Sequence, residues 1–420
     1  MSKDEAGLLL RDVRIPAGAR ATRPADILVS TRGMILEVGP GLSAPGVETV
    51  DLAGCLAVPG LVDMHQHLDK SSTLAQAPNP DGTLLGAIGA FRAYSEHLEA
   101  DDIIGRAQVT LDRCVAMGAS AIRAHTNVDY EMQLRGVDAL TRLRDANRDR
   151  VDVQVVAFIT SSAARGDPDK ARACLEEALA AGADCIGGVP NLAPDPRRYI
   201  DMLLDAAEKH GRMVDLHVDE TLDPEARWFD YLVEGTRRRA LGGRVVASHV
   251  CALSARPDDE ARRAIEAAAE AGVGVCTLPA ANLFLQGRGS GHRVPRGLTR
   301  VTELLAAGVT VATASDNIQD AFVPVGAGDP LEIARWTILA AHLLEDAAAS
   351  AFDMVTAAPA RLMGLDERYG LRRGAAANLL LTRCENVEDL VAGGSLVRTV
   401  LHEGRVVAGG FDAMRPAGRT

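Results

Sequence analysis

The sequence lacks a long apolar run and a paired-cysteine motif. No stretch approaches the roughly 18 apolar residues that a membrane span needs, and the first seven residues do not follow the pattern of a signal peptide. The seven cysteines are odd in number, widely spaced and contain no CxxC pair, which argues against a disulfide framework and a thiolate zinc site. We therefore expect a cytoplasmic protein with reduced cysteines and no membrane partner.

The sequence also lacks a basic stripe. Its 57 acidic residues outnumber the 45 Lys and Arg and give a net charge of −12, which argues against a nucleic-acid partner. The PCxxC ligands of the compact zinc deaminases that act on nucleic acids are absent as well. A hydrophobic share of 47% over 420 residues is enough for a large core. Nothing in the sequence sets the oligomeric state, so a homo-oligomer stays open.

Two β-rich ends enclose a segment in which strands and helices alternate. Short β runs and turn residues fill residues 1–56 and return in residues 370–420, so we expect these segments to form one small β-sandwich-like domain. Residues 57–369 alternate apolar runs with amphipathic helical stretches such as 167–182 and 257–272. The runs predicted as strands are 58–64, 119–124, 151–158, 185–189, 213–217, 244–248, 272–278 and 309–314. Eight βα units predict an α/β fold, a TIM (β/α)8 barrel.

Histidines and carboxylates follow these predicted strands, where a TIM barrel carries its active site. His65 and His67 are one residue apart, so in a strand both side chains point to one side and can bind one ion. This pair alone is equally compatible with two histidines that bind nothing. The candidates at the other strand ends are His125, His217, Glu220, His249 and Asp316. Several imidazoles and a carboxylate at one mouth are costly without an ion, so we expect a catalytic divalent cation with an open position for water.

The motifs resemble those of the amidohydrolase superfamily, and within it the bacterial cytosine deaminase branch and the triazine N-alkylamino hydrolases. The resemblance covers nearly the whole chain and rests on residues 59–70, 215–220, 247–249, 282–288 and 314–317. It implies one metal ion, Zn²⁺ or Fe²⁺. The implied ligands are His65, His67, His217 and Asp316. The predicted third and fourth strands offer no lysine at their ends that could be carboxylated to bridge two ions, which favours a mononuclear site.

The resemblance implies a metal-dependent deaminase that acts on a small cyclic amidine-like nitrogen heterocycle. Hydroxide formed at the ion would attack an sp² ring carbon, and ammonia or an alkylamine would leave. By the same resemblance, Asp316 takes the proton of the water and His249 holds the hydroxide. Glu220 lies three residues after His217 and would protonate the ring nitrogen next to the reacting carbon.

Further residues are expected around the substrate. They are Lys70, His125, Phe158, Thr160, Gln286, Asn317 and Phe322. Lys70 orients a polar or anionic edge or is a surface lysine, and His125 either lines the pocket or supports the first strand. Thr160, Asn317 and Phe322 stand where cytosine deaminases have glutamine, aspartate and tryptophan. Lost polar contacts change substrate discrimination strongly, so cytosine itself is disfavoured and the triazine-type relatives are favoured.

Three alternatives stay open on the same scaffold. A cyclic amide or lactam hydrolase would open a ring, and its product would be a new carboxylate without a released amine. A hydrolase of an N-substituted aminotriazine would release an alkylamine. A non-catalytic metal-binding barrel is the remaining alternative, and it predicts that Glu220→Gln removes no measurable turnover.

Overall fold

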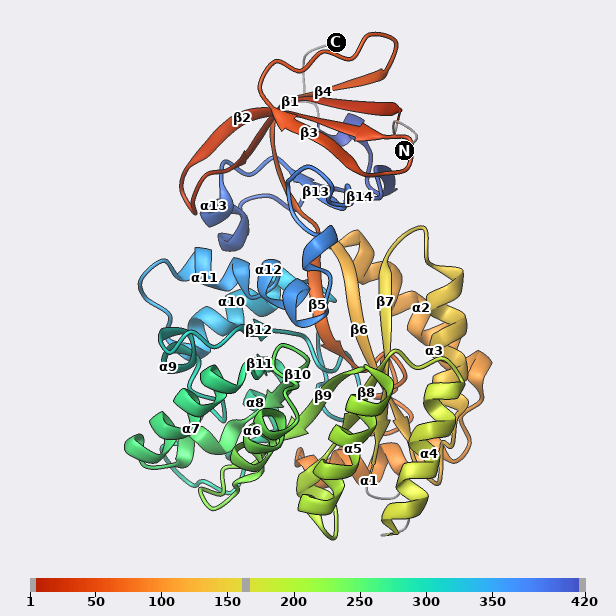
Figure 1. The fold of residues 1–420 in the computed structure, drawn as a ribbon, viewed down its shortest axis with the longest axis vertical. Helices are drawn as coiled ribbons and strands as arrows, with labels where there is room; N and C mark the ends of the chain where they lie inside the picture. Colours follow the sequence, from red (N-terminus) through yellow and green to blue (C-terminus); the bar gives the residue numbers. More distant parts are fainter. Residues whose placement is uncertain (1–4, 161–166, 415–420) are drawn as a thin grey trace.

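The computed structural model describes residues 5–160 and 167–414, which form two sheets with helices around one of them (Figure 1). The strands of the terminal sheet are β1 (Ala6–Pro16), β2 (Thr22–Ser30), β3 (Ile35–Gly39), β4 (Glu48–Pro59), β13 (Leu379–Thr382), β14 (Arg398–His402) and β15 (Arg405–Ala408). The strands of the barrel sheet are β5 (Leu61–Gln66), β6 (Ala119–Val128), β7 (Asp152–Ile159), β8 (Cys185–Gly188), β9 (Met213–Val218), β10 (Val245–His249), β11 (Gly274–Thr277) and β12 (Val311–Thr313).

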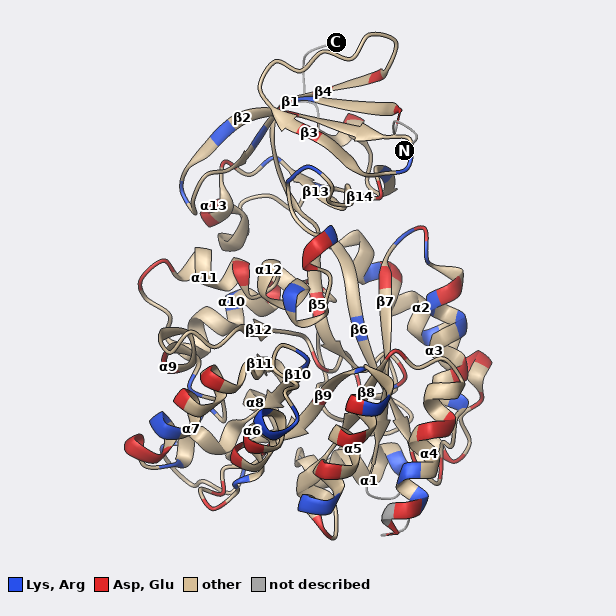
Figure 2. Ribbon diagram, in the orientation of Figure 1, with Lys and Arg blue, Asp and Glu red and all other residues tan. Residues whose placement is uncertain are grey.

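Most of the helices lie around the barrel sheet, whereas the last one lies beside the terminal sheet (Figure 1). Those of the first half are α1 (Leu84–Ser95), α2 (Ala100–Ala116), α3 (Arg135–Ala146), α4 (Pro168–Ala180), α5 (Pro196–His210) and α6 (Trp228–Arg238). Those of the second half are α7 (Asp258–Ala271), α8 (Pro279–Leu285), α9 (Val301–Ala306), α10 (Pro330–Ala341), α11 (Ala347–Asp353), α12 (Ala357–Leu362) and α13 (Val387–Ala392). Figure 2 shows acidic and basic residues interspersed along the outer helices.

The barrel strands pair in parallel and in sequence order from β5 to β12, which confirms the predicted α/β barrel. A parallel bridge between Gln66 and Asp316 joins the two outermost strands of this sheet. The chain therefore closes its barrel at the carboxyl ends of β5 and β12. This closure lies where the sequence places the candidate site.

The predicted first barrel strand, 58–64, begins too early. Val58 and Pro59 belong to β4 of the terminal sheet, where Val58 pairs with Leu380 of β13. Gly60 separates β4 from β5, and a Cβ atom at Gly60 would lie 2.5 Å from the Cβ of Ser120. The apolar run is continuous in sequence, but the Pro-Gly pair divides it between two sheets.

The terminal sheet joins the two ends of the chain, as predicted. Its order is β15-β14-β13-β4-β1-β2-β3, with β1 and β4 parallel and the other neighbours antiparallel. The sheet also curls, because Ile35 N donates to Ala375 O at 2.8 Å and so ties the β3 edge to the segment before β13. The division of the chain at residues 56/57 and 369/370 stays a prediction.

Asp-Pro pairs begin three of the helices. Asp167 caps α4, Asp195 caps α5 and Asp329 caps α10, each through a side-chain oxygen that accepts a backbone N–H of the first turn. The proline that follows each aspartate has no N–H to leave unpaired. In the described parts of the chain, no helix is both long and apolar enough to cross a membrane. All seven cysteines are free, and six of them are buried.

Candidate active site

Four barrel strands bring imidazoles to one mouth of the barrel. His65 lies in β5, His125 in β6, His217 in β9 and His249 in β10, and His67 follows β5 directly. Asp316 follows β12. All six side chains are buried, with residue exposures of 6% or less. The sequence-predicted residues therefore meet in one place, as the barrel requires.

The ring nitrogens of three histidines converge on one point. The Nε2 atom of His217 lies 3.2 Å from Nε2 of His65 and 3.1 Å from Nε2 of His67. The Oδ1 atom of Asp316 lies 3.6 Å from Nε2 of His65 and 3.4 Å from Nε2 of His67. Tetrahedral coordination at 2.0–2.2 Å places neighbouring ligand atoms about 3.3–3.6 Å apart. The donor set therefore fits a divalent cation.

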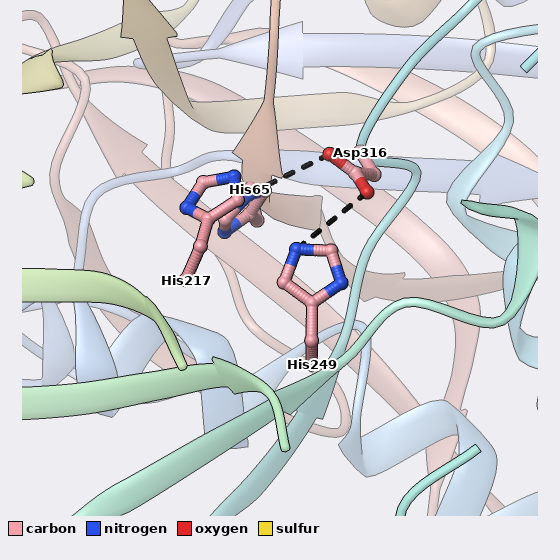
Figure 3. A group of neighbouring side chains, drawn as sticks. All are labelled: His65, His217, His249 and Asp316. Atoms are coloured by element: carbon pink, nitrogen blue, oxygen red, sulfur yellow. Dashed lines mark hydrogen bonds and ion pairs between the residues drawn. The ribbon is translucent and has the colours of Figure 1, made fainter. Parts of the chain in front are cut away.

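The carboxylate of Asp316 faces different partners with its two oxygens. Oδ1 faces His65 and His67, whereas Oδ2 lies 3.9 Å from Nε2 of His249. Figure 3 shows Asp316 between His65 and His249, with His217 beside His65. Ligand atoms of His65, His217, His249 and Asp316 all lie within 4.8 Å of one another. His249 is therefore near the three-imidazole cluster but on the other side of the carboxylate.

Backbone hydrogen bonds and positive φ angles fix two of these residues. Asp316 N donates to His65 O at 2.8 Å, and His67 N donates to Asp316 O at 2.8 Å. Asp316 has a φ of 62° and His249 a φ of 70°, values in the left-handed region that non-glycine residues seldom adopt. Such strain is typical of functional sites, where the surrounding structure holds it.

Glu220 lies beside His249 at the wall of the site. Its Oε1 atom is 3.5 Å from Nδ1 of His249, and the side chain is 9% exposed. Burial, and then the nearby charge of Asp316, raise the pKa of Glu220 well above its ordinary value. Burial raises the pKa of Asp316 to about 6. Perturbed carboxylates in a cleft are candidates for proton transfer.

A cavity of about 640 Å³ opens over the cluster. Most of the residues predicted around the substrate line it: Lys70, Phe158, Thr160, Gln286, Asn317 and Phe322. Trp228, which could stack on a planar ring, also lines it. Lys70 is only 3% exposed, and its Nζ lies 2.8 Å from Nδ1 of His67 and 2.9 Å from Oδ1 of Asn127. Lys70 is thus a buried residue of the site and not a surface lysine.

His125 lies behind the cluster. Its ring stacks on that of His65 with centroids 3.9 Å apart, and burial lowers its pKa to about 3, so it is neutral. It is not among the residues that line the cavity in the described chain. Arg288 contacts Phe284, with its guanidinium 4.5 Å from the ring centre, and is likewise outside that lining.

The structure adds residues that the sequence analysis did not single out. Ile88, Phe91 and Arg92 of α1 line the cavity, as do Asn127 and Asp129 after the predicted second strand. Arg92 pairs with Glu131 across the segment after β6. No strand-end pattern marks the three residues of α1, because this helix is inserted after β5 and supplies one side of the cavity. Asn127 could have been found, since it lies two residues after His125 on the same strand face.

Comparisons with known proteins agree with this site. The sequence model of the amidohydrolase family matches residues 127–408. The pterin deaminase of Rhizobium rhizogenes is 32% identical over 392 residues, which cover 91% of this chain and 87% of that protein.

Solved structures give the same assignment. The 5-methylcytosine deaminase of Klebsiella pneumoniae, liganded with 5-fluorocytosine, superposes with a TM-score of 0.88 and 30% identity over 96% of this chain and 97% of that chain. The N-isopropylammelide isopropylaminohydrolase of Burkholderia multivorans gives a TM-score of 0.83 and 31% identity over 97% and 99% of the two chains. The chain belongs to the amidohydrolase family, the hydrolases of carbon–nitrogen bonds.

Proposed function

We propose that this amidohydrolase removes ammonia by hydrolysis from a planar nitrogen heterocycle that contains a cyclic amidine. The observation that carries the proposal is the arrangement of Asp316 between three converged imidazole nitrogens and His249, with Glu220 on the far side of His249. Oδ1 of Asp316 is placed to bind an ion, and Oδ2 is placed to accept a proton from the attacking water. This is the division of work that hydrolytic deamination needs.

The ion would be held by His65, His67, His217 and Asp316, and Zn²⁺ and Fe²⁺ both suit these donors. When bound, it would supply a water whose pKa is lowered to about 7 in the best zinc case. A second group, His65, His125 and Asp215, also has ligand atoms close together. Arg123 already neutralises Asp215 at 3.1 Å, with both side chains fully buried, which supports a single ion.

Two carboxyl groups, those of Asp316 and Glu220, can carry out the proton transfers of the reaction. Oδ2 of Asp316 points away from the imidazole cluster toward His249 and can accept the proton of the water. Glu220, whose pKa is raised by burial and then by Asp316, holds a proton that it can give to the ring nitrogen beside the reacting carbon. Glu220, then a carboxylate, can take the hydroxyl proton of the addition product and pass it to the leaving amine, and the proton held by Asp316 restores the acid form of Glu220. The sum is one water consumed and one ammonia released.

The relatives support the substrate class. The pterin deaminase, the 5-methylcytosine deaminase and the N-isopropylammelide isopropylaminohydrolase are each named for a planar nitrogen heterocycle. Phe158 and Phe322 line the cavity together with Trp228 and can cover the faces of such a ring. The cavity also reaches Ile88 and Phe91 of α1, which gives room for a fused second ring. A pterin-like two-ring substrate is therefore our first candidate.

The test is a product screen with zinc-loaded and iron-loaded protein. Pterin, 5-methylcytosine, cytosine, N-isopropylammelide and a cyclic lactam are incubated with equal enzyme, and ammonia, isopropylamine and new carboxylate are measured separately. Ammonia from pterin or another aminated ring supports the proposal. Isopropylamine alone would assign the alkylamine-releasing reaction, and a carboxylate without amine would assign ring opening. No product from any compound would contradict the proposed function.

A further inference from the structure

A buried polar chain lies beneath His65, outside the cavity. The Nδ1 atom of His65 is 3.0 Å from Oγ of Ser248, and Oγ of Ser248 is 2.7 Å from Oδ1 of Asp215. Oδ2 of Asp215 accepts a hydrogen bond from Nη1 of Arg123 at 3.1 Å. All four side chains are buried, with residue exposures of 0%. This row of hydrogen-bonded side chains crosses four barrel strands, from β6 through β9 and β10 to β5.

The charges of these four side chains determine which atom donates in each of their hydrogen bonds. A buried guanidinium needs a charged partner, so Asp215 opposite Arg123 is a carboxylate and can only accept hydrogen bonds. Ser248 has one hydroxyl proton, and the 2.7 Å contact with Asp215 uses it. Toward His65 the same hydroxyl can therefore only accept. It follows that Nδ1 of His65 is the donor in this contact and carries a proton.

The other two imidazoles of the cluster have no hydroxyl acceptor at Nδ1 in the described residues. In the described residues, Nδ1 of His217 has no hydrogen-bond partner. Nδ1 of His67 faces Nζ of Lys70 at 2.8 Å, a group that is itself a donor when charged. His65 is thus the imidazole whose Nδ1 atom faces acceptors: the hydroxyl of Ser248 at 3.0 Å and, further away, Oδ1 of Asp215 at 3.5 Å.

We propose that Ser248 is a positioning residue: held as a donor to Asp215, it accepts Nδ1–H of His65 and keeps Nε2 of His65 unprotonated and aimed at the cation. This inference rests on the proposed metal site and adds a residue that touches neither the ion nor the cavity. Outer groups of this kind orient a ligand ring, and their loss costs about 10–100-fold in metal affinity.

Ser248→Ala removes the acceptor and little volume, and Ser120→Ala is the matched control. Ser120 is also a buried serine of a barrel strand, but its hydroxyl donates to the backbone oxygen of Leu61 and does not approach the site. Zn²⁺ is titrated into each metal-free protein against a chromogenic chelator. We expect Ser248→Ala to bind zinc about 10–100-fold more weakly than the wild type and Ser120→Ala to bind within about twofold of it.

A second readout measures the tautomer directly and does not need the metal. Long-range ¹H–¹⁵N spectra of the metal-free chain are recorded, and His65→Gln identifies the signals of His65. The expected spectrum has the proton of His65 on Nδ1 in the wild type. In Ser248→Ala the more distant Oδ1 of Asp215 is the remaining acceptor, so we expect a larger share of the tautomer with the proton on Nε2.

Zinc affinity unchanged in Ser248→Ala but lost in His65→Gln would overturn the inference while leaving the metal site intact. A wild-type proton on Nε2 would also overturn it, whether or not Ser248→Ala folds. Failure of the wild type to bind zinc would instead count against the proposed function, and the spectra would then decide the role of Ser248 alone.

Discussion

The backbone N–H of Asp316 donates to the carbonyl of His65 at 2.8 Å. These residues are 251 positions apart in the sequence (316 − 65); His65 lies near the carboxyl end of the first barrel strand, and Asp316 follows the last one. The hydrogen bond that helps close the barrel therefore also sets the spacing of two proposed ligands. The site can therefore form only when the barrel closes correctly.

Asp316→Asn keeps the shape of the side chain but removes its charge. We expect it to lower zinc affinity and kcat/KM each by more than about 100-fold, because a proposed ligand and proton acceptor is lost at once. The measurements are metal content by mass spectrometry and rates on the best compound of the product screen. Asp258→Asn, whose side chain is 96% exposed, is the control and should match the wild type. A metal-replete, fully active Asp316→Asn protein would refute the assignment.

Glu220→Gln tests the proton donor separately from the metal. We expect kcat to fall by about 10²–10⁴-fold while the zinc content stays at the wild-type value, because an amide cannot transfer the proton. Glu225→Gln is the matched control, since Glu225 is an exposed acid at the rim of the same cavity. Unchanged turnover in Glu220→Gln would favour a different proton donor, whereas no turnover in either the wild type or the variant would favour the non-catalytic alternative.

Asp320 gives a pH dependence of stability with a defined sign. Burial raises its pKa to about 7 from an ordinary value of 3.8, so the folded chain binds its proton more tightly than the unfolded chain does. The proton therefore stabilises the fold at low pH, and this stabilisation is lost as pH rises through about 7. Between pH 5.5 and 8 the loss is about 2 kcal/mol.

Chemical denaturation of the metal-free protein measures this effect. The free energy of unfolding of the wild type, minus that of Asp320→Asn, should fall by about 2 kcal/mol from pH 5.5 to pH 8. The control Asp258→Asn should show no such trend, since its side chain is solvent-exposed. A difference that is flat or rises with pH would show that Asp320 is not protonated in the folded state.

Gly60→Ala tests the junction between the two sheets. The new Cβ would lie 2.5 Å from Cβ and Oγ of Ser120, so we expect destabilisation of about 1–3 kcal/mol. Gly39→Ala is the control, because nothing lies within 4 Å of a Cβ there. Thermal and chemical unfolding provide the measurement. Adding Ser120→Gly to Gly60→Ala should restore part of the loss, and equal effects of Gly60→Ala and Gly39→Ala would contradict the steric account.

The sequence predicted the barrel because each apolar run is bounded by turn signals and followed by an amphipathic helix. It could not divide the run at Gly60, since both halves are equally apolar and only the pairing of Val58 with Leu380 assigns the first half to the other sheet. It also could not show that Arg123, inside a predicted apolar strand, is fully buried against Asp215. Such pairings depend on tertiary structure that local patterns do not encode.

The sequence predicted which histidines and carboxylates meet at the mouth of the barrel, but not the cavity wall that α1 supplies. His65, His217 and Asp316 are recognisable because a parallel barrel brings all strand ends to one face. Phe91 and Arg92 lie on α1, a helix of the segment after β5 whose position over the mouth follows from packing and not from a strand-end motif. The roles assigned to these residues stay predictions until they are measured.

The central claim is that one divalent cation binds among His65, His67, His217 and Asp316. Anomalous diffraction from crystals of the zinc-loaded protein tests it most directly. We predict one strong peak per chain, about 2.0–2.2 Å from the three Nε2 atoms and Oδ1 of Asp316. A chain that remains fully active with no peak at this position, or with zinc bound only elsewhere, would contradict the account.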